Sequence, residues 1–415
     1  MFKVPAKLWV ALAVTLLASM GISLPYPVLT PLFIDAEPSS LNSFYGLSGE
    51  VLFTIIIAVY PLGIFIGSSF IGALSDRFGR RRVLAQTLGI CFVGYLISAY
   101  ALYIENYPLL LISRFFTGIT EGNVAIARAI ALDIGDDESQ GISKIRAVSL
   151  INSAIFLGWL LGPLIGGVLA HFQPYFAMLA AAVGAVICYL LVKYALAETN
   201  QTVSSNKLSL WQAVVTENSL QLIRDNWIRR LFFMYFTYAM AMNLYYEFYP
   251  VWLVEGQGFG SLAIGLSTTN MTIFMTLSSI FLATWVQGRF GTLKPMMVVM
   301  AMMSLCLFLL PFTLSVSTQF IFAYSGAIVA IFNGILPVYI SEKQSDKGNG
   351  AVMGLLTTTF CLANVFAAMI GGGLLLIGTS APLFLASGLY VLALVMIWQF
   401  FAKTDATEMA IKNQA

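Results

Sequence analysis

Long apolar runs recur along the whole chain, and each is about as long as a segment that crosses a lipid bilayer. About 20 apolar residues in an α-helix span the hydrocarbon core. A helix also satisfies its own backbone hydrogen bonds, which a spanning segment needs because lipid offers no partner. The runs lie near residues 8–34, 49–73, 83–103, 109–133, 145–170, 175–196, 229–254, 262–286, 294–313, 317–340, 350–377 and 382–402. The sequence therefore predicts an all-α membrane protein with twelve transmembrane helices.

The composition fits a surface that faces lipid. The chain is 59% hydrophobic and 10% charged, whereas a soluble domain carries about 25% charged residues. So few charges cannot cover a soluble protein of 415 residues. No basic patch is interleaved with aromatic residues, which argues against a nucleic-acid partner. The first apolar run has no small-residue cleavage site, so we expect it to be retained as a helix.

The positive charges test the helix count. With both termini in the cytoplasm, 19 of the 21 Lys and Arg residues fall in predicted inner segments. The other two, Arg114 and Arg128, lie inside the fourth predicted helix, and the outer loops hold acids such as Asp35 and Glu105. Positive charge collects on the cytoplasmic side of membrane proteins. We therefore expect a multi-pass protein of the cell (inner) membrane with both termini inside.

The two halves of the chain echo each other around one long polar loop. Arg77-Phe78-Gly79 follows the second predicted helix, and Arg289-Phe290-Gly291 follows the eighth, 212 residues later. Such repeats suggest two bundles with a substrate site near the midplane between them. The predicted organisation is an N-terminal six-helix bundle over 1–196, a cytoplasmic linker over 197–228, a C-terminal six-helix bundle over 229–402 and a cytoplasmic tail over 403–415.

The loop after the second helix carries the most specific motif, a pattern of glycines and charges. It reads Gly72-Ala-Leu-Ser-Asp76-Arg77-Phe-Gly79-Arg80-Arg81-Arg82. The arginines hold the loop inside, and Asp76 can pair with a neighbouring Arg or cap a helix N-terminus. This loop resembles the signature of the major facilitator superfamily, and the resemblance covers the whole length. It implies a gating cluster that latches the outward-facing state, in which Arg80 meets Asp133 at the inner end of helix four.

Helix five carries glycines at every fourth position, namely Gly158, Gly162 and Gly166, together with Pro163 and Gly167. Glycines at this spacing line one face and let a facing helix approach closely, and the proline bends the helix. Packing alone explains a plain glycine repeat. The longer pattern is similar to the one that distinguishes the superfamily's proton-coupled antiporters, which favours export.

Helix four holds charges inside the membrane. Arg114, Glu121 and Arg128 are spaced by seven and so lie on nearly one face, about 10 Å apart along the axis. Buried charges normally face a cavity or a partner. Loss of water disfavours the charged form of Glu121, whereas a neighbouring arginine favours that form. Because these two effects oppose each other, Glu121 is a candidate for exchanging a proton with substrate. Arg114-x-x-x-Gly118 resembles the helix-four motif of the superfamily, whose arginine is linked to proton transfer, and the resemblance implies that role for Arg114. The alternative is a structural Arg–Glu–Arg clasp.

Helix seven offers a second carboxylate, Glu247, as a proton or substrate site. Tyr235, Tyr238, Met242, Tyr245 and Tyr249 share one face of this helix, with Tyr246 beside Glu247. Facing a cavity, the stripe suits a lipophilic or aromatic solute. Facing lipid, its outermost members form an interfacial belt.

Uncharged polar residues complete the predicted site. The prolines of helix one leave backbone carbonyl groups without a hydrogen bond inside the helix. Membrane helices tolerate such groups where they line a cavity. That helix resembles the first helix of tetracycline and multidrug antiporters but lacks their acid. Each asparagine below could equally form an interhelical hydrogen bond. The candidates are Ser19, Ser23, Tyr26, Asn152, Asn270, Asn333 and Asn364.

The leading function is a proton-coupled antiporter that exports a small lipophilic or drug-like compound, driven by the proton gradient without a cofactor. A dedicated exporter or importer of one metabolite, such as a siderophore, is the alternative. The chain has no HExxH, no CxxC spacing and no catalytic carboxylate pair, so neither an enzyme nor a metal site is expected. The expected partners are the solute, protons and the lipid bilayer, and we expect the chain to act as a monomer.

Overall fold

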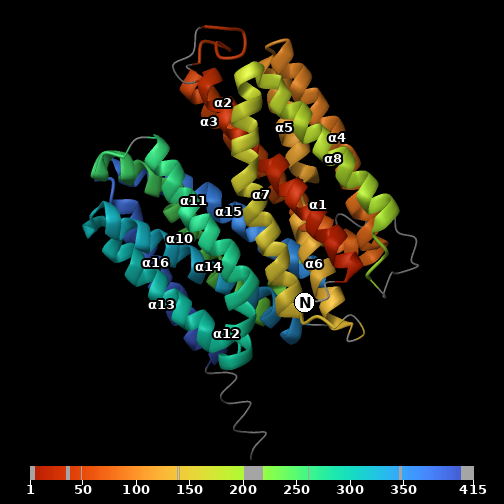
Figure 1. The fold of residues 1–415 in the computed structure, drawn as a ribbon, viewed down its shortest axis with the longest axis vertical. Coiled ribbons are helices and arrows are strands. Elements are labelled where there is room, and N and C mark those ends of the chain that lie inside the picture. The colour runs from red at the N-terminus through yellow and green to blue at the C-terminus, as the bar shows by residue number, and fades with distance from the viewer. Residues whose placement is uncertain are drawn as a thin grey trace, which may run out of the picture. The chain divides into compact units, whose positions relative to one another are not determined.

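The computed structural model describes residues 5–33, 38–47, 49–137, 139, 141–200, 218–259, 261–344 and 348–402. These residues form helices and their connections, with no strand among them (Figure 1). The chain divides into two compact units. Unit 1 comprises Met1–Gln221 and Ser341–Cys361, and unit 2 comprises Leu222–Ile340 and Leu362–Ala415. Residues 201–217 of the predicted linker and the predicted tail lie outside the described residues.

Unit 1 is built from pairs of long helices. In it α4 packs against α8, α1 against α7 and α3 against α5 (Figure 1). Its core contains apolar side chains of α3, α4, α5 and α8, such as Leu52, Cys91, Leu110 and Met178. The helices are α1 (Ala6–Ser23), α2 (Tyr26–Phe33), α3 (Gly49–Phe78), α4 (Arg80–Tyr103), α5 (Tyr107–Thr120), α6 (Asn123–Asp136), α7 (Lys144–Phe172) and α8 (Pro174–Ala195), followed by the 3-10 turn η2 (Ser219–Arg224).

Unit 2 is organised around α16, which packs against both α10 and α13. Two of its helices contain a π-helical turn, η3 (Ser278–Leu282) and η6 (Trp398–Ala402). The first residues of α15 belong to unit 1 and the rest to unit 2. The helices are α10 (Asn226–Gln257), α11 (Ser261–Leu277), α12 (Ala283–Phe290), α13 (Leu293–Leu309), α14 (Ser315–Lys343), α15 (Asn349–Leu375) and α16 (Ala381–Ile397), with the 3-10 turn η4 (Leu310–Phe312) after α13.

The helices have the length and composition that the sequence predicts for membrane spans. Among the described residues, eleven helices or helix pairs are long and apolar enough to cross a bilayer. The twelfth predicted span, 229–254, lies within α10, whose 32 residues are long enough but whose tyrosines and asparagine make it less apolar. The chain is therefore an all-α membrane protein.

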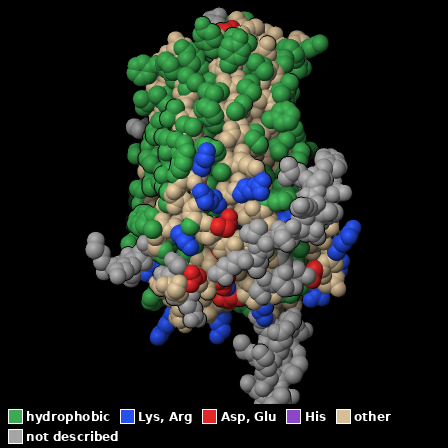
Figure 2. All heavy atoms as spheres, turned by 90° about the vertical axis from the view of Figure 1, so that its right-hand side faces the viewer, with side chains coloured by type: hydrophobic (Ala, Val, Ile, Leu, Met, Phe, Trp, Pro, Cys, Tyr) green, Lys and Arg blue, Asp and Glu red, His purple; other side chains and the backbone are tan. Residues whose placement is uncertain are grey.

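The outer surface of unit 1 is apolar in the way that lipid requires. On α4, Ile90, Val93 and Ile97 are exposed and share one face of the helix. On the face drawn in Figure 2, hydrophobic side chains cover a broad band, and Lys and Arg side chains gather toward one end. An apolar band beside a basic end is the pattern of a helix bundle that crosses a membrane.

Two predicted spans are broken inside the membrane region. The first breaks at Leu24–Pro25, between α1 and α2, as its prolines suggest. The fourth breaks between α5 and α6, and this corrects the prediction of one continuous helix over 109–133. Glu121 and Gly122 leave helical geometry there, with ψ of 25° and 10°. The assumed common face of Arg114, Glu121 and Arg128 is therefore interrupted at its central residue.

Candidate functional sites

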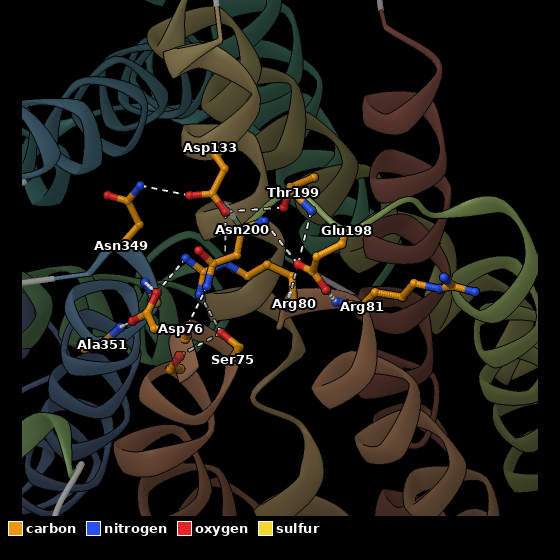
Figure 3. A network of polar contacts seen from close by, with 12 residues as sticks. Ser75, Asp76, Arg80, Arg81, Asp133, Glu198, Thr199, Asn200, Asn349 and Ala351 are labelled. Atoms are coloured by element: carbon orange, nitrogen blue, oxygen red, sulfur yellow. Dashed lines mark hydrogen bonds and ion pairs between the residues drawn. The ribbon is translucent and has the colours of Figure 1, made fainter. Parts of the chain in front are cut away.

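A cluster of charged side chains lies where α3 meets α4, within unit 1 (Figure 3). The Arg80 guanidinium lies between two carboxylates, with Nη2 2.6 Å from Asp76 Oδ1 and Nε 3.0 Å from Asp133 Oδ2. Its Nη1 donates to Ser75 Oγ at 2.7 Å. Arg80 is buried, and a buried charge needs such partners. The structure brings Arg80 and Asp133 together as the sequence predicts, while the gating role of the pair stays a prediction.

Asp76 also holds the first turn of α15. Its carboxylate accepts the backbone N–H of Gly350 at 2.9 Å and of Ala351 at 2.6 Å (Figure 3). An acid at a helix N-terminus satisfies free N–H groups and complements the helix dipole. Asn349 donates to Asp133 Oδ1 at 3.0 Å. The cluster thus joins α3, α4 and α6 to the start of α15.

The glycines of the signature loop have separate structural reasons. A Cβ at Gly72 would collide with the Gly350 carbonyl oxygen, so α3 and α15 can approach only without it. Gly79, between α3 and α4, has a φ of 94°, which L side chains rarely adopt. Gly291 occupies the equivalent place after α12 with a φ of 76°. Arg77 is buried, and its guanidinium lies 5.6 Å from the centroid of the Phe78 ring.

Sequence reasoning missed Ser75 and Asn349 of this cluster. It also missed three residues that follow α8 at the start of the predicted linker. Glu198 accepts the backbone N–H of Arg80 at 2.9 Å and of Arg81 at 3.1 Å, at the N-terminus of α4. Thr199 donates to Asp133 at 3.3 Å, and Asn200 donates to the Asp76 carbonyl oxygen (Figure 3). One signal in the sequence pointed to Glu198. The N-terminus of α4 has free N–H groups, and Gly79 has no side chain to cap them, whereas Glu198 is an acid shortly after the sixth predicted helix.

Glu121 lies at the break between α5 and α6, and is 3% exposed. Tyr95 of α4 donates its hydroxyl to Oε1 at 2.9 Å, and Asn123 donates its amide to Oε2 at 3.2 Å. Thr87 of α4 in turn donates to Asn123 at 2.9 Å. The break therefore places a carboxylate inside unit 1, with each oxygen accepting one hydrogen bond.

The two arginines of this segment do not clasp Glu121. The Arg114 guanidinium lies 3.9 Å from the centroid of the Tyr60 ring, and its Nε and Nη1 have no hydrogen-bond partner among the described residues. Arg128 donates to Asn152 Oδ1 through Nε at 3.2 Å and Nη2 at 3.1 Å. The Arg–Glu–Arg clasp is therefore wrong, because the helix break turns the three side chains to different partners.

The glycine face of α7 packs against α1. A Cβ at Gly158 would lie 2.6 Å from the Leu16 carbonyl oxygen, and one at Gly162 would lie 2.7 Å from that of Met20. Gly166 faces the Leu24 carbonyl oxygen in the same way, while Gly167 faces open space. Pro163 lies inside α7.

Ser19 and Ser23 lie in this α1–α7 interface. Ser23 donates toward the Gly158 carbonyl oxygen at 3.3 Å as well as to its own helix. Ser19 is buried and its Cβ would lie 2.8 Å from a Cβ at Gly158. Both serines thus pack helices together. The side chain of Tyr26, the third candidate in this region, lies outside what the structure describes.

In unit 2, Glu247 is half-buried and belongs to an amide cluster. Asn364 of α15 donates its amide to Glu247 Oε1 at 2.6 Å and to Asn243 Oδ1 at 3.2 Å. Asn243 in turn donates to the Ala239 carbonyl oxygen of its own helix at 2.9 Å. The predicted candidates Glu247 and Asn364 are therefore neighbours.

The aromatic stripe of α10 is a core face of unit 2. All five members are buried, so a belt that faces lipid is wrong. Tyr238 packs on Phe332 with ring centroids 4.1 Å apart, and Tyr245 bonds to Ser325 at 3.0 Å. Buried Met242 belongs to the same face. Tyr246 lies at the edge of the same face; it is half-buried and donates to Met275 Sδ at 3.6 Å.

The remaining asparagine candidates of unit 2 lie on other helices. Asn270 of α11 donates to the Gln319 carbonyl oxygen of α14 at 2.8 Å, an interhelical hydrogen bond. Asn333 is half-buried on α14. Among the residues that the structure describes, no group of three or more His, Cys, Asp or Glu could hold a metal ion.

Long apolar helices with arginine and glutamate enclosed inside them define the class of this protein, a multi-pass membrane transporter. The sequence matches the Major Facilitator Superfamily over residues 11–368, and the chain belongs to that family. Members of the family are transporters, and the chain is not an enzyme.

Similar proteins include efflux proteins of bacteria. The chain is 23% identical over 368 residues to the tetracycline resistance protein, class B, of Escherichia coli, covering 87% of each chain. It is 25% identical over 408 residues to multidrug resistance protein 2 of Bacillus subtilis (strain 168), covering 94% of each.

Two solved structures share the fold. The human organic anion transporter MFSD10 (TETRAN) superposes with a TM-score of 0.77 at 21% identity, covering 96% of this chain and 100% of that one. The proton:xylose symporter XylE gives a TM-score of 0.75 at 18% identity, covering 95% of each. The major facilitator fold of two pseudo-symmetric six-helix bundles therefore applies to this chain.

Proposed function

We propose that the protein is a proton-coupled antiporter that exports a small organic compound by alternating access. The relatives named for tetracycline and multidrug resistance support export. The single observation that carries the proton coupling is Glu121, a carboxylate enclosed at a helix break inside unit 1.

The hydrogen bonds of Glu121 give proton exchange a structural consequence. An ionised carboxylate only accepts hydrogen bonds, and here it accepts one from Tyr95 and one from Asn123. A protonated carboxyl carries an O–H donor on one oxygen. Each oxygen has a second lone pair that can take the proton, and the oxygen that takes it becomes a weaker acceptor for Tyr95 or for Asn123. Proton exchange at Glu121 would therefore weaken one of the hydrogen bonds that hold the break between α5 and α6.

The Arg80 cluster provides the gate in this proposal. Asp76 binds the first turn of α15 through two backbone N–H groups, and Arg80 holds Asp76 in place. Releasing that turn breaks charge-assisted hydrogen bonds, which are about twice as strong as neutral ones. The cluster thus stabilises one state of the transport cycle and opposes the other.

The remaining parts of the proposal concern the setting of the protein. The distribution of Lys and Arg in the sequence supports cytoplasmic termini, and the bacterial relatives support the inner membrane. We propose a monomer that exchanges a compound for protons and needs no cofactor.

Transport by purified protein in liposomes tests the proposal. A pH gradient with an acidic lumen is imposed, and uptake of tetracycline, a fluoroquinolone and 1-naphthylmethylamine is followed. Protein whose cytoplasmic side faces outward should accumulate at least one of these probes. Glu121→Gln keeps the size of the side chain but cannot exchange a proton, so it should lose the accumulation that depends on pH.

The matched control is Glu105→Gln, an acid-to-amide change at an exposed position between α4 and α5. It should transport like the wild type. Accumulation by Glu121→Gln at the wild-type level would remove Glu121 from the mechanism.

A further inference from the structure

Arg114 is a buried cation of unit 1 whose hydrogen-bond donors are largely unused. The residue is 3% exposed, and its Nε and Nη1 form no hydrogen bond with the described residues. These two nitrogens carry three of the five N–H donors of a guanidinium. No acid among the described residues forms a salt bridge with Arg114. A buried charge is costly unless it is paired and hydrogen-bonded, so the guanidinium needs a further partner.

The contact that Arg114 does make leaves these donors unused. Its guanidinium carbon lies 3.9 Å from the centroid of the Tyr60 ring on α3. A cation–π contact covers one face of the guanidinium, whereas the N–H bonds lie in its plane and point outward from its edge. The Tyr60 hydroxyl is also buried and forms no hydrogen bond with the described residues, although it interacts electrostatically with Tyr95. Arg114 and Tyr60 thus place unused N–H and O–H donors side by side.

The charges enclosed in unit 1 show which sign the missing partner has. Apart from the first and last four residues of each span, the six predicted spans of this half contain three charged residues, namely Arg114, Glu121 and Arg128. Two cations therefore accompany one carboxylate, and a proton on Glu121 would raise the excess of positive charge from one to two. Unbalanced charge inside a membrane is costly. The partner that Arg114 needs is therefore an anion.

The packing around Arg114 limits the size of this anion. A Cβ at Gly63 of α3 would collide with the Phe115 carbonyl oxygen of α5, so the two backbones touch here. A Cβ at Gly118 would collide with the Tyr60 carbonyl oxygen in the same way. Tyr60 is 1% exposed. An organic solute could reach the pair only if α3 and α5 separated, whereas an anion of one atom needs little more room than a water molecule.

We propose that Arg114 and Tyr60 bind a small inorganic anion of the halide class, such as chloride, inside unit 1. The N–H groups of Nε and Nη1 donate to the ion, and the ion supplies the negative charge that the enclosed arginines lack. This site goes beyond the proposed function, because it holds neither the exported compound nor the proton. It is linked to Glu121 by charge, since Arg114 and Glu121 interact electrostatically. An anion beside Arg114 is repelled by an ionised Glu121 and binds more tightly when Glu121 is neutral.

Thermal unfolding in two salts tests the site. The purified full chain is heated in detergent with a thiol-reactive fluorophore, at one fixed pH, in mixtures of sodium chloride and sodium gluconate of constant total concentration. The ionic strength is then constant and only the small anion varies. An ion that binds the folded protein alone raises the midpoint of unfolding. The wild-type midpoint should rise with chloride by about 1–3 °C and then level off as the site fills, and bromide should act in the same way.

Three variants locate the ion. Arg114→Gln should have the same midpoint in chloride and in gluconate. The matched control is Arg128→Gln, which removes the other arginine of the same predicted span and should keep the wild-type rise. Glu121→Gln removes a negative charge that interacts with Arg114, so it should reach half of the rise at a chloride concentration at least about 3-fold lower. In crystals grown with bromide, anomalous scattering should place an ion against the Arg114 guanidinium.

A wild-type midpoint that is equal in chloride and gluconate would overturn the proposal, and it is the result expected if water alone meets these donors. A rise that survives in Arg114→Gln would place the ion elsewhere and would overturn it too. If Arg114→Gln does not fold, Glu121→Gln decides, because an unchanged half-saturating concentration contradicts an anion beside Arg114. These readouts need no transport, so the anion site can fail while the proposed function stands, and the reverse.

Discussion

The contact between α1 and α7 allows a quantitative test within a single helix. A Cβ at Gly158 would lie 2.6 Å from the Leu16 carbonyl oxygen, 2.8 Å from the Ser19 Cβ and 2.9 Å from the Met20 nitrogen. Two of these three atoms are backbone, which cannot move aside without shifting α1. A Cβ at Gly167 meets nothing within 4 Å. Alanine adds the same methyl group at both positions. At Gly158 the methyl group meets the atoms of α1, and at Gly167 it meets open space.

The expected sizes of the two effects follow from opposing terms. Alanine favours a helix over glycine by about 1 kcal/mol, and this gain applies at both positions. Overpacking costs about 1–3 kcal/mol, and it applies to Gly158 alone. Gly167→Ala should therefore stabilise the protein slightly. Gly158→Ala should be about 1–3 kcal/mol less stable than Gly167→Ala, since the difference between the two isolates the overpacking.

The four cysteines supply the assay. Cys91, Cys188, Cys306 and Cys361 are free and buried, so a thiol-reactive fluorophore reports their exposure when the protein is heated in detergent. The midpoint should be lower for Gly158→Ala than for Gly167→Ala. Equal midpoints for the two variants would refute the close contact between α1 and α7.

Three further predictions concern the polar sites. Asp76→Asn removes the negative charge that holds Arg80 and the first turn of α15. The steady-state rate of probe uptake in liposomes should therefore change at least several-fold. An unchanged rate would contradict the proposal that the Arg80 cluster is the gate. Glu198→Gln weakens the cap of α4. Because Glu198 is exposed, the loss of stability should be about 0.5–1 kcal/mol, typical of a modest cap, and the thermal midpoint should drop slightly. An unchanged midpoint would show that this cap does not stabilise the protein. Tyr95→Phe removes one hydrogen-bond donor to Glu121. The loss of this donor disfavours the ionised carboxylate, so the pH range over which uptake changes should shift upward. An unshifted pH profile would show that Tyr95 does not influence the carboxylate.

Much of the fold could be predicted because lipid imposes simple rules. Apolar runs of bilayer length and the clustering of Lys and Arg depend on the sequence alone. The pairing of Arg80 with Asp133 could be expected from the resemblance of the signature loop to that of the superfamily, and it gives a buried arginine the acid that it needs. The close approach of α7 to another helix could be expected from its glycine spacing.

The parts that could not be predicted depend on packing between segments far apart in the sequence. Glu121 and Gly122 end one helix and start another, yet neither forbids a continuous helix, so the break was invisible in the sequence. Whether the tyrosines of α10 face lipid or core depends on which helices pack beside them. The hydrogen bonds of Glu198 join segments 118 residues apart, and no periodicity reports such a contact.

The most direct test of proton-coupled export is to measure protons moving in response to the compound. Purified protein is placed in liposomes that contain a pH-sensitive dye, with no initial pH gradient, and a probe that the wild type transports is added outside. Liposomes without protein correct for passive diffusion. Entry of the compound should drive protons out and raise the luminal pH, and Glu121→Gln should abolish this response. Uptake of the compound with no change in luminal pH, or with protons moving inward beside it, would contradict the account.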